Sequence, residues 1–191
     1  MSMIIAILIG IGLSASAGFR VFIPPLITSI AAKASWITLA TQFEWVGSTP
    51  ALIAFSIAAI LEISSYYIPV IDNAMKAIAT PASIVSGILL TASLVWDVDP
   101  LLKWSVSVLG GGGIATITHL MTLFIRGTST IVTGGIGNIL VSILEGISAI
   151  ALSILSLLFP FAVIIAIVVI LWMFFKTIRS LKRRRKVIAS E

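Results

Sequence analysis

Three kinds of residue are scarce in this sequence, which contains no cysteine, one histidine and few charged side chains. Without cysteine the chain has no disulfide, no thiolate metal ligand and no thiol nucleophile. The single histidine, His119, has no second imidazole with which to form a usual zinc site. Charged residues make up 10% of the chain, against roughly 25% in soluble domains. The sequence therefore predicts neither a metal nor a cofactor, and it excludes a water-soluble globule.

Apolar residues are abundant instead, at 59% of the 191 residues, and the mean hydropathy is +1.21. A spanning helix needs about 20 mostly apolar residues. We therefore predict an all-α protein, a polytopic bundle of about six transmembrane helices embedded in a lipid bilayer. The predicted spans are 3–31, 50–68, 81–96, 103–125, 136–157 and 160–176. The first is long and interrupted and the third is short, so five or seven elements with a re-entrant piece stay open.

The basic residues are concentrated near the C-terminus, where seven of the twelve Lys and Arg lie between Lys176 and Lys186. A basic cluster directly after an apolar span indicates the cytoplasmic side. We therefore predict a transmembrane domain over residues 1–176 and a basic cytoplasmic tail over residues 177–191, in a plasma or inner membrane. The tail accounts for the formal charge of +5 without a nucleic-acid partner. Because no basic segment precedes Met3, we interpret the N-terminus as a retained first span rather than a signal peptide.

Small residues recur at helical spacing in two of the predicted spans. One stripe consists of Ala6, Gly10, Ser14 and Gly18, and the other of Ser142, Gly146, Ala149, Ser153 and Ser156. Such stripes let helix backbones approach closely in lipid. They favour plain helix packing over a substrate path, and they would also allow a homodimer. Four consecutive glycines, 110–113, would either unwind a helix or admit a neighbouring backbone.

The two halves of the chain resemble each other weakly. Each has a glycine-rich helix with an arginine, then a helix with an Ile-Leu-Glu tripeptide, then a helix that opens at proline. The matching residues are Arg20 and Arg126, Glu62 and Glu145, and Pro81 and Pro160. Three spans per half would insert the second copy from the opposite side, which gives the 3+3 inverted repeat of many secondary transporters. Chance similarity stays open as the alternative.

Arg20 stands at an expected break in the first span, just before Pro24 and Pro25. The two prolines remove two amide donors and disrupt a continuing helix. Freed amides and a guanidinium both donate hydrogen bonds, so Arg20 is a candidate for binding an anion or a polar headgroup. The alternatives are an arginine that reaches the membrane interface and a structural partner for a buried carboxylate.

Glu62 and Glu145 lie well inside the second and fifth predicted spans. A lone carboxylate in lipid costs several kcal/mol, so each should face the bundle and be either paired or protonated. Two interpretations stay open: ion pairing with Arg20 and Arg126, and proton or cation coupling.

Polar residues around the second arginine complete the set of candidates. His119 shares a helical face with Thr116, Thr122 and Arg126, which suits either a packing residue or a proton relay. After Arg126, the residues Thr133 and Asn138 flank a glycine-rich turn before the fifth span. Backbone donors at that helix N-terminus could attract an anion, although an ordinary polar loop needs no function.

Several of these motifs together resemble the bacterial membrane proteins grouped as domain of unknown function 4126. The motifs are Ala17-Gly18-Phe19-Arg20, Ile23-Pro24-Pro25-Leu26, Leu61-Glu62, Ile68-Pro69 with Asp72, and the series His119, Arg126, Asn138, Ser142 and Glu145. The resemblance covers roughly residues 5–150 and leaves out the last span and the tail. It implies a small polytopic membrane protein but no particular activity.

The leading hypothesis is a small transporter or permease for a polar or anionic solute. Arg20, Arg126, Asn138 and Thr133 would bind the solute, while Glu62, Glu145 and His119 would carry a proton or form ion pairs. The alternative is a lipid-binding or membrane assembly protein whose arginines bind lipid phosphate. We predict no enzyme, because the sequence has no recognisable catalytic or nucleotide-binding motif.

Overall fold

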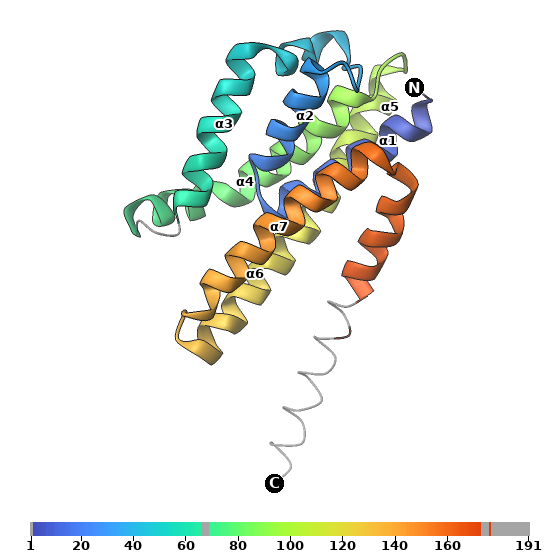
Figure 1. Cartoon of the computed structure of the whole chain (residues 1–191). Helices are drawn as coiled ribbons and strands as arrows, with labels where there is room; N and C mark the ends of the chain where they lie inside the picture. Colours follow the sequence, from blue (N-terminus) through green and yellow to red (C-terminus); the bar gives the residue numbers. More distant parts are fainter. Residues whose placement is uncertain (1, 66–68, 173–175, 177–191) are drawn as a thin grey trace.

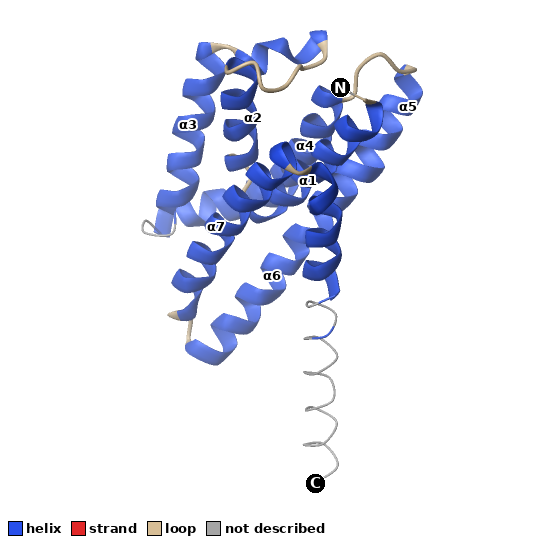
Figure 2. Ribbon diagram, turned by 45° about the vertical axis from the view of Figure 1, so that its right-hand side comes forward, coloured by secondary structure: helices blue, strands red, loops and turns tan. Residues whose placement is uncertain are grey.

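The computed structural model describes residues 2–65, 69–172 and 176, and side chains are placed for 2–65, 78–172 and 176. Every regular element within these residues is a helix, which confirms the predicted all-α class (Figure 2). The predicted tail, residues 177–191, lies outside the described residues.

Helix α1 (Met3–Phe19) runs through the middle of the bundle (Figure 1). It packs against α4 (Pro69–Leu94), α6 (Gly113–Thr133) and α7 (Gly137–Leu158). Its small residues make this possible: the Ser14 hydroxyl donates to the carbonyl of Gly87 at 2.7 Å, and a Cβ on Gly18 would lie 2.7 Å from the carbonyl oxygen of Ala115. The small-residue stripe of the first span therefore packs helices together.

The first predicted span is divided into two helices at the expected break. Helix α1 ends at Phe19, Arg20 has an extended backbone, and α2 (Ile23–Lys33) begins with Pro24 and Pro25 in its first turn. Proline fits the start of a helix, where its missing amide has no partner to lose. In both views α2 turns back toward the side on which the N-terminus lies (Figures 1 and 2). The expected break in the span 3–31 is therefore present, and α2 does not continue in the direction of α1.

The second and third predicted spans differ in length from the helices observed. A short 3-10 helix, η1 (Thr41–Gly47), leads at a 63° bend into α3 (Thr49–Ser64). Helix α4 is 26 residues long and contains Pro81 in its interior, so the predicted span 81–96 is only its C-terminal part. Asp72, which belongs to one of the family motifs, lies in the N-terminal part of α4, and its side chain is outside the part of the chain whose side chains are described.

A long helix follows, made of α5 (Pro100–Ser105), a π-helical segment η3 (Val106–Gly112) and α6. The four glycines both loosen the helix and admit a neighbour, as the sequence suggested. A Cβ on Gly111 would lie 2.5 Å from the carbonyl oxygen of Gly87 on α4, whereas a Cβ on Gly113 would meet nothing within 4 Å. Gly111 therefore sets how closely the long helix approaches α4.

This contrast gives a matched pair of variants within one glycine run. We expect Gly111→Ala to destabilise the protein by about 1–3 kcal/mol, because the added methyl group has no room beside α4. We expect Gly113→Ala to be neutral or to stabilise by up to about 1 kcal/mol, because alanine favours helix where space is open. Unfolding in mixed detergent micelles measures both. Equal stabilities of the two variants would contradict the close packing of Gly111.

The outer surfaces of the helices are largely apolar, and the inner surfaces carry buried polar side chains beside small and apolar ones, as expected for a protein in lipid. On α7 the exposed residues include Ile139, Leu140, Ile143, Leu144 and Ile147, and the buried ones include Ser142, Glu145, Ser153 and Ser156. Among the described helices, Pro100–Thr133 and Gly137–Leu158 are long and apolar enough to cross a membrane, and η1 with α3 would add a third span. Shorter apolar helices are Met3–Phe19, Ile78–Leu94 and Pro160–Trp172.

Candidate functional site

The Arg20 side chain is buried at the break between α1 and α2. One terminal nitrogen donates to the carbonyl and the hydroxyl of Ser142, at 2.9 and 2.6 Å, and the other donates to the carbonyl of Glu62 at 3.4 Å. The planar guanidinium thus reaches α3 and α7 through two separate terminal nitrogens, whereas a lysine has a single nitrogen. Arg20 therefore joins the broken helix to two other helices.

The Glu62 carboxylate holds the break from the side of α3. Its two oxygens accept hydrogen bonds from the backbone amides of Val21 and Phe22, at 2.7 and 3.0 Å. Amides at a helix start lack intrahelical partners, and a negative charge is favourable there. The acidic residue predicted to lie deep in the second span thus satisfies the donors that the break exposes.

An ion pair between Arg126 and Glu145 joins α6 to α7. The Arg126 Nε donates to Glu145 Oε1 at 2.8 Å, and Arg126 Nη2 pairs with the other carboxylate oxygen. Glu145 follows Ser142, the partner of Arg20, by nearly one turn of α7. The structure therefore brings together the four ionisable residues selected from sequence, and Arg126 forms an ion pair with Glu145.

His119 connects α6 to two other helices. Its Nδ1 lies 3.3 Å from the carbonyl oxygen of Gly18, and its Nε2 lies 3.0 Å from the hydroxyl of Thr80 on α4. Thr80 was not among the predicted site residues, and no periodicity marks it. Of the predicted neighbours, Thr116 and Thr122 donate to backbone carbonyls within their own helix.

A polar cavity of about 420 Å³ lies beside these contacts. Its polar lining residues are Glu62, Ser65, His119, Thr122, Arg126, Thr130 and Asn138. Arg20 and Thr133, which we predicted to bind solute, are not among the described lining residues. The Thr133 hydroxyl instead donates to the carbonyl of Ser129 at 2.7 Å and accepts from the Gly137 amide at 2.9 Å, so it closes the turn between α6 and α7.

Asn138 offers this cavity a hydrogen-bond acceptor. The Thr130 hydroxyl donates to the carbonyl of Arg126, so it accepts from the Asn138 side-chain nitrogen at 2.8 Å. This arrangement fixes the orientation of the amide. The Asn138 carbonyl oxygen is then buried without a hydrogen-bond partner among the described residues.

One family model covers most of the chain. The model described as "Domain of unknown function (DUF4126)" matches residues 7–180. The chain belongs to this family. The DUF4126 match extends beyond residue 150 and includes the Pro160–Trp172 helix, so the resemblance is longer than the sequence motifs suggested. No curated protein and no solved structure matches this DUF4126 chain.

Proposed function

We propose that this DUF4126 protein is a small permease for a polar or anionic solute, coupled to protons through Glu62. The observation that carries the proposal is the position of Glu62, whose carboxylate binds the broken helix and also borders the polar cavity. Arg126, Asn138 and His119 line the same cavity and supply donors and acceptors for a solute. Ionisable residues at membrane depth are functional candidates because they are costly to keep there.

Proton uptake by Glu62 would act on the helix break. An ionised carboxylate only accepts hydrogen bonds, whereas a protonated one carries an O–H donor and loses acceptor capacity. One of the two amide contacts, to Val21 or to Phe22, would then weaken. Because α3 holds the α1–α2 break through these contacts, protonation would loosen α3 and widen the cavity beside it.

The proposal includes a membrane topology in which α1 and α2 form a re-entrant pair. In both views α2 turns back toward the side of the N-terminus (Figures 1 and 2), and α3, α4, α6 and α7, which follow it, are each longer than α2. The basic tail after the Pro160–Trp172 helix would lie in the cytoplasm of a plasma or inner membrane. The proposal also includes the inverted repeat. It is supported by one arginine–glutamate contact in each half, from Arg20 to Glu62 on α3 and from Arg126 to Glu145 on α7.

Lipid-headgroup binding by the arginines, the second hypothesis from the sequence, has weaker support. Arg20 is bonded to Ser142 and to Glu62, and Arg126 is paired with Glu145. A phosphate would have to displace these contacts to reach either guanidinium.

Proteoliposomes that enclose a pH-sensitive dye can test the coupling. Phosphate, sulfate, acetate and glycine are added outside one at a time, under an imposed proton gradient. We expect solute-dependent acidification for the wild type and a rate no higher than that of empty liposomes for Glu62→Gln, which keeps the size of the side chain but cannot titrate. Glu145→Gln should retain part of the flux, because Glu145 pairs with Arg126.

The matched control is Glu44→Gln, since Glu44 is exposed on η1 and lies away from the cavity lining. We expect this variant to transport at the wild-type rate. Equal flux in the wild type and Glu62→Gln would contradict proton coupling. Absence of flux with every solute, in protein that remains folded and monodisperse, would contradict a permease for solutes of this class.

A further inference from the structure

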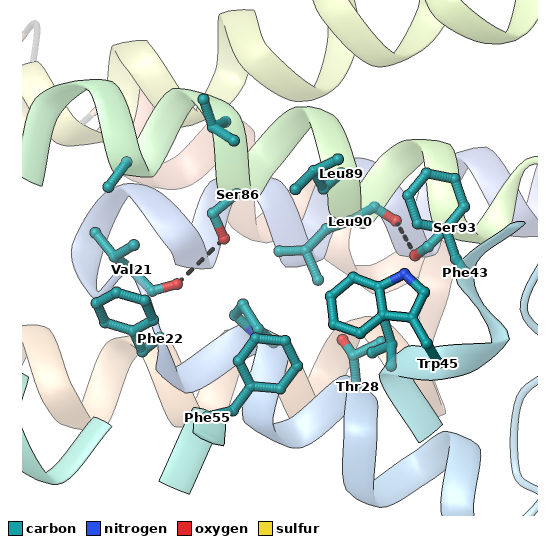
Figure 3. A pocket seen from close by; sticks show the side chains of 14 residues that line it. Val21, Phe22, Thr28, Phe43, Trp45, Phe55, Ser86, Leu89, Leu90 and Ser93 are labelled. Atoms are coloured by element: carbon teal, nitrogen blue, oxygen red, sulfur yellow. Dashed lines mark hydrogen bonds between the residues drawn. The ribbon is translucent and has the colours of Figure 1, made fainter. Parts of the chain in front are cut away.

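A second cavity, of about 220 Å³, lies between the α1–α2 break, η1, α3 and α4 (Figure 3). Its walls are almost entirely apolar. Phe22, Phe55 and Trp45 line one side, and Leu89 and Leu90 of α4 face them across the space. The centroids of the Trp45 and Phe55 rings are 6.2 Å apart, so the two rings pack against each other on this side. A cavity of this kind suits an apolar chain rather than the polar solute proposed above.

One residue that lines this cavity has a polar atom without a partner. Thr28 is fully buried, and its hydroxyl oxygen has no hydrogen-bond partner among the described residues. The other lining hydroxyls are satisfied, since Ser86 donates to the carbonyl of Val21 at 3.1 Å and Ser93 to that of Leu90 at 2.9 Å.

Helical serines and threonines elsewhere in the chain commonly donate to the carbonyl four residues earlier, as Ser56, Thr116 and Thr128 do. The Thr28 hydroxyl makes no such bond. A buried hydroxyl without a partner is unfavourable. The cavity therefore suits an apolar ligand that also carries one hydrogen-bonding group.

The position of Thr28 in the bundle indicates the depth of that group. Its neighbour Ser29 donates to the carbonyl of Val46 at 2.6 Å, which ties this turn of α2 to η1. The segment η1 carries Glu44 and Trp45, and Trp45 is 54% exposed. Tryptophan and charged residues of this kind belong at the headgroup level of a bilayer. With η1 at that level, Thr28 would lie just below the headgroups, at the depth of lipid ester groups.

The cavity also opens toward the outer surface of α4. Two of its lining residues, Val85 and Leu89, are 52% and 39% exposed. An outward apolar opening on a membrane helix faces acyl chains. We propose that this cavity binds one acyl chain of a membrane phospholipid, whose ester carbonyl accepts a hydrogen bond from Thr28.

Native mass spectrometry of the full chain in mild detergent can test the site, with dioleoyl phosphatidylglycerol as the titrated probe. Thr28→Val removes the hydroxyl at nearly constant volume, and we expect it to weaken lipid retention about fivefold, the value of one ordinary hydrogen bond. Thr28→Ser keeps the hydroxyl and should retain lipid as the wild type does. Ala82→Phe places a ring in the cavity and should abolish the saturable lipid adduct, whereas Ala151→Phe, on the exposed face of α7, should not.

Three results would overturn the proposal. The first is equal lipid retention by Thr28→Val and Thr28→Ser, which would mean that the hydroxyl makes no contact with the lipid. The second is equal retention by Ala82→Phe and Ala151→Phe, which would place the lipid elsewhere. The third is retention of oleate as strong as that of the phospholipid, which would mean that a free fatty acid is the ligand.

Discussion

Replacing Glu145 by alanine is expected to lower the free energy of unfolding by about 3 kcal/mol, because it leaves Arg126 without its carboxylate. Removal of one partner from a buried pair usually costs about 3–5 kcal/mol. We expect the lower end of this range, because the Arg126 side chain is 18% exposed and the Glu145 side chain is 6% exposed. Unfolding of the purified protein in mixed micelles measures the difference.

A double substitution separates the charge from the packing. Arg126→Leu with Glu145→Leu removes both charges together, and such replacements are often neutral or stabilising. We therefore expect the double variant to be clearly more stable than Glu145→Ala and close to the wild type. If the double variant loses as much stability as Glu145→Ala, the ion pair is not the cause of the loss.

The polar centre could be predicted because charge in lipid has few acceptable positions. Arg20, Glu62, Arg126 and Glu145 stand out in an apolar sequence, and each must face the bundle to avoid lipid. The structure places all four around the helix break and α7. The role of Ser142 in receiving Arg20 was not predicted, because a serine within a small-residue stripe is equally suited to plain helix packing.

The path of the chain after the break could not be predicted in the same way. Pro24 and Pro25 indicate that the first helix stops, but the direction of α2 depends on contacts with distant residues. Ser29 bonds to Val46, and Glu62 holds the amides of the break. Apolar composition fixes only that a segment lies in lipid, not whether it crosses or returns.

The two cavities could not be predicted from the sequence either. The polar cavity combines residues from α3, α6 and α7, and the apolar one combines α2, η1, α3 and α4. Thr80 is part of the site because it contacts His119, and Thr28 because it lines the same cavity as Trp45. Both partners are more than 15 positions away in the sequence. A single sequence gives no signal for such contacts, since neither residue interrupts an apolar pattern as a charge does.

The largest effect is expected at Arg20, which bridges three helices. We expect Arg20→Leu to lower the free energy of unfolding by about 3–5 kcal/mol, because buried acceptors on Ser142 and Glu62 lose a charged donor and the break loses its link to α7. Arg20→Lys keeps the charge but not the planar fork, so it should cost about 1.5–3 kcal/mol, as loss of a charged hydrogen bond does. We therefore expect the wild type to be the most stable, Arg20→Lys to be intermediate and Arg20→Leu to be the least stable.

The control is Lys33→Leu, which removes a positive charge from an exposed position on the same segment. Lys33 donates only to the exposed hydroxyl of Thr49 among the hydrogen bonds described for it, so the change should stay within about 0.5 kcal/mol. The same mixed-micelle unfolding measures all three variants. If Arg20→Leu is as mild as Lys33→Leu, then Arg20 does not hold α2, α3 and α7 around the break. If Arg20→Lys matches the wild type, charge alone is enough, and the reach of the guanidinium to two helices contributes nothing to stability.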